Sequence, residues 1–295
     1  MGSEMCIRDS IMTENACNFI NPITFETLTG NKCLVDTFDR NFQFNVEHVS
    51  LAKLADIFLV APASADVIGK IANGIADDML TTTIMACKCP KLISPAMNTN
   101  MFTNPIVQDN LKKLEHYGYE IIQPDSGYLA CGDTGAGKMP SEQVLLNYIL
   151  RTIAKDKDMT GIKLTVTAGP TREKLDPVRF LSNNSTGKMG YAIAKMAMLR
   201  GADVTLISGK VSLEPVPFVK MVDIVSAEDM YNAVIKSAKD ADIIIKAAAV
   251  ADYRPSDVSD EKIKKKDGDM SIPLERTKDI IGTLGSSKRD GLFLC

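Results

Sequence analysis

The run Ile57-Phe-Leu-Val-Ala61 decides the fold of this chain. Five apolar residues without alternation indicate a strand covered on both faces, as strands are in a parallel sheet. Pro62-Ala-Ser-Ala65 ends this strand. A helix is predicted from Ala65 to about Cys87, because apolar residues recur there at spacings of three and four. They are Val67, Ile68, Ile71, Ile75, Met79 and Leu80.

The same alternation of strand and helix continues outward from this run. Towards the C-terminus we predict strands at 91–97 and 119–123, a helix at about 104–117 and another at about 141–155. Towards the N-terminus, Ile11–Asp39 shows no clear strand, and Pro22 opens a short helix. Alternating elements predict a doubly wound α/β sheet, whose ligands bind beyond the carboxyl ends of its strands. Both Pro62–Ala65 and Pro95–Asn98 fall at such ends.

The segment Gln123–Pro140 holds four glycines and two prolines. So many turn-forming residues predict a loop, which we interpret as a flap that closes over a small anionic substrate. Gly132–Lys138 also fits the first seven positions of a phosphate-binding P-loop. However, Met139 stands where that motif needs Ser or Thr, and Pro140 follows where its helix should begin.

A second α/β series begins after a charged linker. We predict strands at 164–168, 202–208, 218–225 and 241–250 and helices at 191–200 and 227–238. Leu181–Gly190, rich in small polar residues, precedes the first of these helices. Its free backbone N–H groups would suit an anion, although a plain capped helix start is equally compatible. The chain stops at Gly291–Cys295, which resembles a strand that is cut off without a partner.

Composition excludes several classes of protein. With 34 basic and 37 acidic residues among 295, the chain lacks the excess of positive charge that is typical of nucleic-acid-binding proteins. No apolar run is long enough to span a membrane. The seven scattered cysteines indicate reduced thiols in a cytoplasmic protein. Cys87-Lys-Cys89 lacks the second pair that a zinc site would need.

The chain resembles the bifunctional phosphopantothenoylcysteine decarboxylase/phosphopantothenate-cysteine ligase family of coenzyme A biosynthesis. The resemblance covers about Ile11 to Cys295, and the matching motifs occur in the family's order. They are Pro95-Ala-Met-Asn98, Ala130–Met139, Thr167–Glu173, Asp176–Arg179, Ser182–Gly190, Ala248–Arg254 and Lys262–Lys265.

For the first domain, the resemblance implies FMN-dependent decarboxylation of 4'-phospho-N-pantothenoylcysteine. The resemblance implies that His48 acts as a base, whereas the residues alone favour a satisfied surface or core imidazole for one of only two histidines. Asn98 would orient the substrate carboxylate, and Cys131 would donate a proton. The implied flavin contacts are Pro62, Ala63, Ser64, Ala65 and Met97, and the implied substrate clamp is Asp133, Lys138 and Met139. The family usually has arginine at the position of Lys138. Lysine keeps the positive charge but lacks the planar guanidinium of arginine.

For the second domain, the resemblance implies that CTP activates 4'-phosphopantothenate, so that the amine of cysteine can form an amide. Asn183 would hold the acyl intermediate. The implied nucleotide contacts are Ala248, Ala249, Asp252, Lys262, Lys264 and Lys265. Mg²⁺ would accompany the triphosphate, with its protein ligands unassigned. Asp252 and Arg254 could instead form a local ion pair at a strand end.

The expected organisation is two doubly wound, Rossmann-like domains. Residues 1–10 match nothing in the family, 11–155 form the decarboxylase domain without its first strand, 156–162 a linker, and 163–295 a ligase domain without its C-terminal part. We therefore expect truncation at both ends and impaired activity. The resemblance also implies a homo-oligomer. The alternatives are a flavin- or nucleotide-binding oxidoreductase and an inactive binding subunit.

Overall fold

The computed structural model describes residues 7–37, 47–128, 132, 134–264, 269–286 and 291–295. The predicted site residues Cys131, Asp133 and Lys265 lie outside these residues. The chain divides into two compact units, Met1–Ile153 and Ala154–Cys295. Across the described residues, no helix has the length and apolarity needed to cross a membrane.

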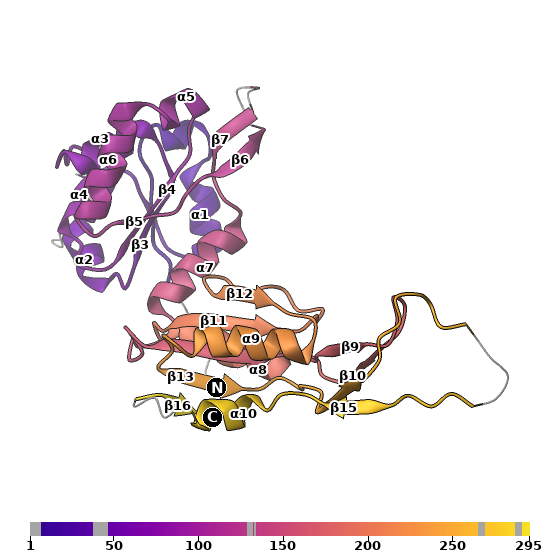
Figure 1. Cartoon of the computed structure of the whole chain (residues 1–295). Helices are drawn as coiled ribbons and strands as arrows, with labels where there is room; N and C mark the ends of the chain where they lie inside the picture. The colour runs from indigo at the N-terminus through magenta and orange to yellow at the C-terminus, as the bar shows by residue number, and fades with distance from the viewer. Residues whose placement is uncertain (1–6, 38–46, 129–131, 133, 265–268, 287–290) are drawn as a thin grey trace. The chain divides into compact units, whose positions relative to one another are not determined.

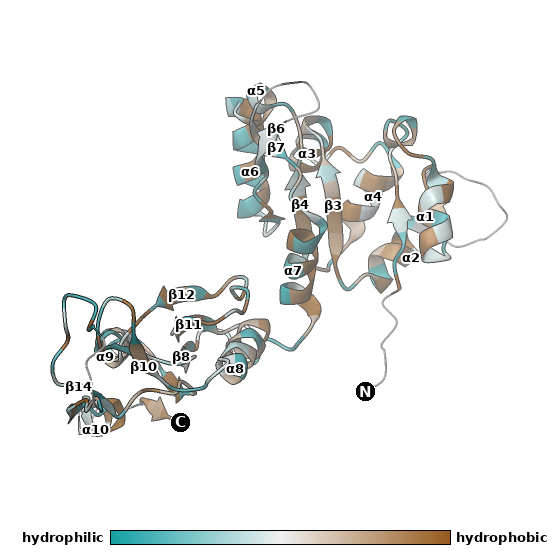
Figure 2. Ribbon diagram, turned by 90° about the vertical axis from the view of Figure 1, so that its right-hand side faces the viewer, coloured by the Kyte–Doolittle hydropathy of each residue, from teal (hydrophilic) through white to brown (hydrophobic). Residues whose placement is uncertain are grey.

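The first unit is built on parallel strands β3 (Phe58–Ala63), β4 (Lys91–Pro95) and β5 (Glu120–Ile121), in that spatial order. In register, Leu59 lies beside Leu92. Figure 2 shows apolar residues along β3 and β4. The predicted strand at 57–61 is confirmed, and its burial on both faces explains why its residues do not alternate.

Helices cover both faces of this sheet. The helices α3 (Ala65–Ala72), α4 (Met79–Ala86) and α6 (Pro105–His116) pack on one face around Ile68, Ile84, Ile93 and Leu114. On the other face, α7 (Glu142–Ile153) packs against Leu92 and Ile122. This is the doubly wound arrangement that the sequence predicts (Figure 1).

The single helix predicted from Ala65 to Cys87 is wrong, because α3 and α4 are separate helices. Gly74 interrupts the run with a φ of +71°, and Asp78 starts α4 through a capping box with Thr81. Ile75, which the helical periodicity includes, is exposed in this break.

Elements before β3 were only partly predicted. Helix α1 (Pro22–Thr29) has the expected Pro22 in its first turn. Between Ile11 and Asp39 we predicted no strand, yet β1 (Ser10–Ile11) and β2 (Cys33–Leu34) pair in parallel. Two-residue strands are too short to show a pattern of hydrophobicity. A 3-10 turn, η1 (Ala16–Asn18), and α2 (Glu47–Leu54) complete this region.

The segment predicted as a loop at 123–140 contains a β-hairpin instead. Its strands are β6 (Asp125–Tyr128) and β7 (Thr134–Lys138), which pair antiparallel. Two of its glycines, Gly135 and Gly137, mark close contacts with α5 (Thr99–Phe102) and the residues before it, rather than turns.

The second unit holds a parallel sheet with the strand order β12-β11-β8-β13-β16. These strands are β8 (Lys163–Ala168), β11 (Asp203–Ser208), β12 (Lys220–Asp223), β13 (Ile243–Lys246) and β16 (Phe293–Leu294). The expectation that Gly291–Cys295 lacks a partner is wrong, because β16 pairs with β13.

Two separate cores flank this second sheet. Helix α8 (Lys188–Leu199) packs on one face around Ala194, Val166 and Leu206. Helices α9 (Ala227–Ser237) and α10 (Ile280–Ser286) pack on the other face around Met230 and Ile244. The second unit is therefore also doubly wound (Figure 1).

Antiparallel arms extend this unit beyond the carboxyl ends of its strands. One pairs β9 (Arg172–Lys174) with β10 (Phe180–Ser182), and the other pairs β14 (Tyr253–Pro255) with β15 (Leu274–Arg276). The family motifs of this unit lie largely on these arms and on the turns that lead into them.

Candidate functional site

In the first unit, the predicted cofactor residues lie at the carboxyl ends of β3 and β4. Ser64 caps α3, since its Oγ accepts a hydrogen bond from the N–H of Val67 at 3.3 Å. The N–H of Ala96 donates to the carbonyl oxygen of Ala63 at 3.0 Å. The turn at Pro62–Ala65 therefore lies against the residue that precedes Met97.

The β6–β7 hairpin joins this edge through backbone contacts. The N–H of Met97 donates to the carbonyl oxygen of Gly137 at 3.0 Å. A Cβ added to Gly137, whose φ is +132°, would lie 2.1 Å from the oxygen of Met97. A Cβ on Gly135 would lie 2.5 Å from Thr99 Oγ1. Only glycine allows the backbone of the hairpin to come so close to Met97 and Thr99. The hairpin that carries Lys138 therefore lies beside Asn98.

The other predicted residues of the hairpin and its edge have distinct surroundings. Asn98 caps α5, with Oδ1 accepting from the N–H of Asn100 at 2.8 Å. Lys138 is exposed, which leaves its ammonium accessible to an anion. Met139 is half-buried and packs against the core of Leu92 and Ile122, so it also serves the fold.

Sequence reasoning missed two buried hydroxyls at this edge. Ser94 Oγ on β4 and Thr99 Oγ1 on α5 are buried and have no hydrogen-bond partner among the described residues. Buried polar atoms normally find partners, so these hydroxyls fit a site that a polar ligand completes. Isolated Ser and Thr residues at a strand end carry no sequence signal of this kind.

His48 lies on α2 and is half-buried. Figures 1 and 2 both place α2 toward the opposite end of the unit from α5 and the β6–β7 hairpin. The structure therefore brings together the cofactor turn, Met97, Asn98 and Lys138, but it does not bring the helix of His48 to them within one chain.

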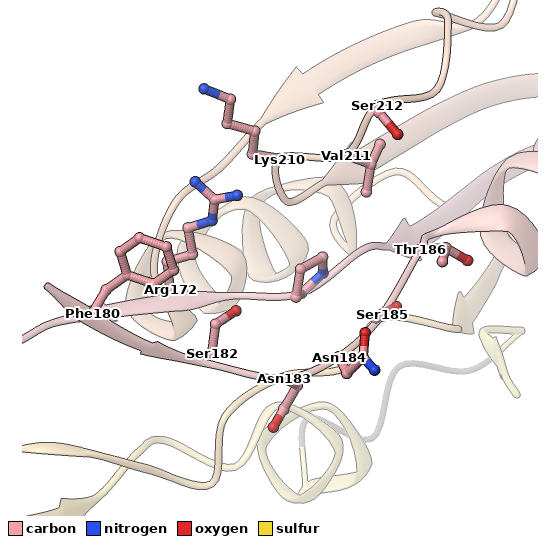
Figure 3. Close-up of a pocket in the computed structure, with 11 residues that line it drawn as sticks. Arg172, Phe180, Ser182, Asn183, Asn184, Ser185, Thr186, Lys210, Val211 and Ser212 are labelled. Atoms are coloured by element: carbon pink, nitrogen blue, oxygen red, sulfur yellow. The ribbon is translucent and has the colours of Figure 1, made fainter.

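In the second unit, a pocket of about 460 Å³ lies at the start of α8, beyond the ends of β8 and β11. Figure 3 shows Arg172 and Lys210 on one side and the segment from Ser182 to Thr186 along the other. The guanidinium of Arg172 lies 4.7 Å from the ring centre of Phe180, which also lines the pocket. Two cations and several small polar groups suit an anionic ligand.

Glycines make this edge of the sheet compact. A Cβ on Gly209 would lie 1.9 Å from the oxygen of Pro170, and one on Gly190 would lie 2.6 Å from Cβ of Ala168. Gly187 is the N-cap residue of α8 and provides no side-chain cap. The pocket lining ends at Thr186, so the start of α8 lies beside the pocket, and its first-turn N–H groups have no acceptor from the side chain of their N-cap residue.

Asn183 lines the same pocket and reaches the end of β13. Its Nδ2 donates to the carbonyl oxygens of Ala249 at 3.2 Å and Val250 at 3.3 Å. The N–H of Ala248 donates to Thr167 Oγ1 at 3.2 Å. The structure therefore brings together the predicted residues Asn183, Ala248 and Ala249.

The other predicted nucleotide contacts that lie within the described residues are exposed. Asp252, Lys262 and Lys264 all have exposed side chains. The carbonyl oxygen of Asp252 accepts from the N–H of Thr277 at 2.9 Å, which joins its turn to the end of β15. Among the described residues, no cluster of three His, Cys, Asp or Glu side chains could hold a metal ion.

Two charged residues without a predicted role also lie in this region. The carboxylate of Asp176 is fully buried and forms an ion pair with Arg179 at 2.6 Å, which holds the pKa of Asp176 well below its usual range. Backbone N–H donors add to this effect. Half-buried Lys246 ends β13, and burial lowers its pKa against the opposing effect of Asp279 and Asp252.

Comparisons with known proteins cover both units. A family model described as Flavoprotein matches residues 7–154, and one described as DNA/pantothenate metabolism flavoprotein C-terminal domain matches 159–295. The solved C-terminal domain of a coenzyme A biosynthesis bifunctional protein CoaBC is 48% identical, with a TM-score of 0.41. That match covers 48% of this chain and 65% of the solved chain, less than two thirds of it.

Two curated relatives match nearly the whole chain. A cysteine/cysteine sulfinic acid decarboxylase from an unknown prokaryotic organism is 42% identical over 280 residues, 93% of this chain and 78% of that protein. The coenzyme A biosynthesis bifunctional protein CoaBC of Bacillus subtilis (strain 168) is 46% identical over 287 residues, 96% of this chain and 71% of that protein. The chain therefore belongs to the family of coenzyme A biosynthesis bifunctional proteins CoaBC.

Proposed function

We propose that the chain makes 4'-phosphopantetheine in two steps, in the cytoplasm. The second unit joins cysteine to 4'-phosphopantothenate with CTP, and the first unit decarboxylates the product with FMN. The observation that carries this proposal is the convergence of separated motifs within each unit. Met97 and Gly137 are hydrogen-bonded in the first unit, and Asn183 and Ala249 in the second.

In the first unit, the turn at Pro62–Ala65, Met97 and the hydroxyl of Ser94 would hold FMN. FMN, when bound, supplies the two-electron redox chemistry that lets CO₂ leave a carbon with no stable carbanion. The amide of Asn98 orients the substrate carboxylate, and Lys138 attracts the substrate's negative charge. His48 moves a proton at the substrate thiol, Cys131 returns a proton to the product, and Asp133 belongs to the substrate clamp.

In the second unit, the pocket lined by Arg172, Lys210 and Asn183 would hold the activated acyl group and its nucleotide. Ala248, Ala249 and Asp252 contact the nucleotide, while Lys262, Lys264 and Lys265 neutralise its phosphates. A free carboxylate resists an amine because its leaving group would be oxide, so CTP first supplies a better one. Mg²⁺ would be held mainly by oxygen atoms of the triphosphate and would help to neutralise its charge. Among the described residues, no group of three His, Cys, Asp or Glu side chains could hold it.

Helix α2, which carries His48, lies toward the opposite end of the unit from the β6–β7 hairpin (Figures 1 and 2). We propose that His48 comes from a neighbouring copy in a homo-oligomer. His48→Gln and Asn98→Ala should each abolish CO₂ release, and a mixture assembled from both variants should regain part of it. A mixture as inactive as its components would contradict a site shared between copies.

A decarboxylase of free cysteine is the competing function, because one relative of that description is 42% identical. Supplying the chain with phosphopantothenate, cysteine, CTP and Mg²⁺, and following CMP and CO₂ separately, distinguishes the two. CTP-dependent CMP release followed by CO₂ supports the proposal. CO₂ from cysteine alone, without CTP, would support the alternative.

A further inference from the structure

The buried carboxylate of Asp176 lies at the turn between β9 and β10 and accepts hydrogen bonds from two directions. Its Oδ1 accepts from the N–H groups of Val178 at 2.8 Å and Arg179 at 2.7 Å. Its Oδ2 accepts from Arg179 Nε at 2.9 Å and Nη2 at 2.6 Å, and from the N–H of Ile263 at 3.2 Å. One carboxylate thus joins its own turn to a segment 87 residues further on.

Arg179 completes this joint from the other side. Its Nη2 also donates to the carbonyl oxygen of Ile263 at 2.9 Å. Both backbone groups of Ile263 are therefore held by one ion pair. Nearby, the N–H of Ser259 donates to the carbonyl oxygen of Leu175 at 3.1 Å, so the segment is attached to the turn at a second point.

The two ends of this joint lead to different parts of the candidate site. Ile263 is half-buried, and the lysines on either side of it, Lys262 and Lys264, are exposed. From Arg179 the chain continues through β10 directly to Asn183, which lines the pocket. Fixing Ile263 therefore sets the position of both lysines relative to Asn183.

We infer that Asp176 and Arg179 are positioning residues, which hold Lys262 and Lys264 where they can neutralise the triphosphate of a nucleotide bound beside Asn183. This inference rests on the proposed ligase function. The inference gives a reason for the buried carboxylate of Asp176 at this turn, where Arg179 and backbone N–H groups satisfy its charge. Without those partners, burying a charged carboxylate would cost free energy.

The test compares CTP binding by the full chain and its variants in the presence of Mg²⁺, measured by calorimetry. Asp176→Asn should weaken CTP binding at least tenfold and speed hydrogen exchange at Ile263. Arg179→Lys keeps the positive charge but loses the planar set of donors of the guanidinium, so it should weaken CTP binding less than Asp176→Asn does. If Asp176→Asn does not fold, Arg179→Lys alone tests the inference. In turnover, the KM for CTP should rise more than kcat falls.

The matched control is Asp158→Asn, which breaks another Arg–Asp pair of the same unit, with Arg200. It should leave CTP binding unchanged. Wild-type binding by both Asp176→Asn and Arg179→Lys would overturn the inference and leave the ligase proposal intact. If the wild-type chain itself binds no CTP, the ligase proposal falls, and the inference falls with it.

Discussion

The side-chain amide of Asn183 donates to the carbonyl oxygen of Ala249 at 3.2 Å, across 66 residues of sequence. The same nitrogen atom also donates to the carbonyl oxygen of Val250 at 3.3 Å. The amide thus ties the segment before α8 to the end of β13, where two motifs of the second unit meet. An amide nitrogen can donate hydrogen bonds, whereas a carboxylate can only accept them. Replacing the side-chain nitrogen of Asn183 by an oxygen atom would therefore remove both hydrogen bonds.

Asn183→Asp should impair the ligase step more than Asn183→Ala does. Alanine loses two hydrogen bonds, worth about 0.5–1.5 kcal/mol each, whereas aspartate also faces two carbonyl oxygens with a negative charge. We expect CMP release to fall about tenfold or more for aspartate, since ~1.4 kcal/mol is a factor of ten. Steady-state assays of CMP release check this order. Equal rates for aspartate and wild type would contradict the role given to the joint.

Gly137→Ala should unseat the β6–β7 hairpin. The new Cβ would lie 2.1 Å from the oxygen of Met97, and a φ of +132° is unfavourable for alanine. Backbone strain alone costs about 1–3 kcal/mol, so both thermal stability and CO₂ release should fall. Gly127→Ala, in the same hairpin, is the control, because its Cβ would meet only Lys138 Cδ at 3.8 Å. If both variants behave alike, the close approach to Met97 has no consequence.

The fold was predictable where burial imposes a long pattern. The run 57–61 overlaps β3 at all residues but Ile57, and the alternation of elements predicts both doubly wound sheets. Prediction failed where local backbone conformation decides. Gly74 breaks a helix that the apolar spacing supports, and β1 and β2 are too short to show any spacing.

The candidate site was predictable only from motif order, and its contacts required the tertiary structure. Family resemblance implied that Asn183 and Ala249 share a site, and they are hydrogen-bonded. The hydroxyl of Ser94, which has no hydrogen-bond partner in the described part of the chain, and the joint between Asp176 and Ile263 depend on segments that meet only after folding. No spacing in the sequence distinguishes such residues from ordinary polar ones.

Gly190→Ala should push α8 away from β8. Its Cβ would lie 2.6 Å from Cβ of Ala168 and 2.8 Å from the oxygen of Thr167, and overpacking of this kind costs about 1–3 kcal/mol. Denaturation midpoints and CTP affinity should both fall. The helical control is Gly69→Ala, whose nearest neighbour would be Asn110 Nδ2 at 3.8 Å. That change should stabilise α3 by about 0.5–1 kcal/mol. Stabilisation by both changes would show that α8 has room at Gly190.

The stabilising effect of Asp176 should disappear in acid. The hydrogen bond from Arg179, followed by those from backbone N–H groups, lowers the pKa of Asp176 in the folded chain. An unfolded aspartate titrates at about 3.9, so its contribution is complete above that pH and declines as the pH falls, because the unfolded chain binds the proton first. Urea unfolding of wild type and Asp176→Asn should differ most near pH 7 and converge as the pH drops below about 4. Asp158→Asn should give a much smaller difference throughout, since its ion pair is exposed. A gap between wild type and Asp176→Asn that stays constant down to pH 3 would mean that Asp176 stabilises the turn by its shape rather than by its charge.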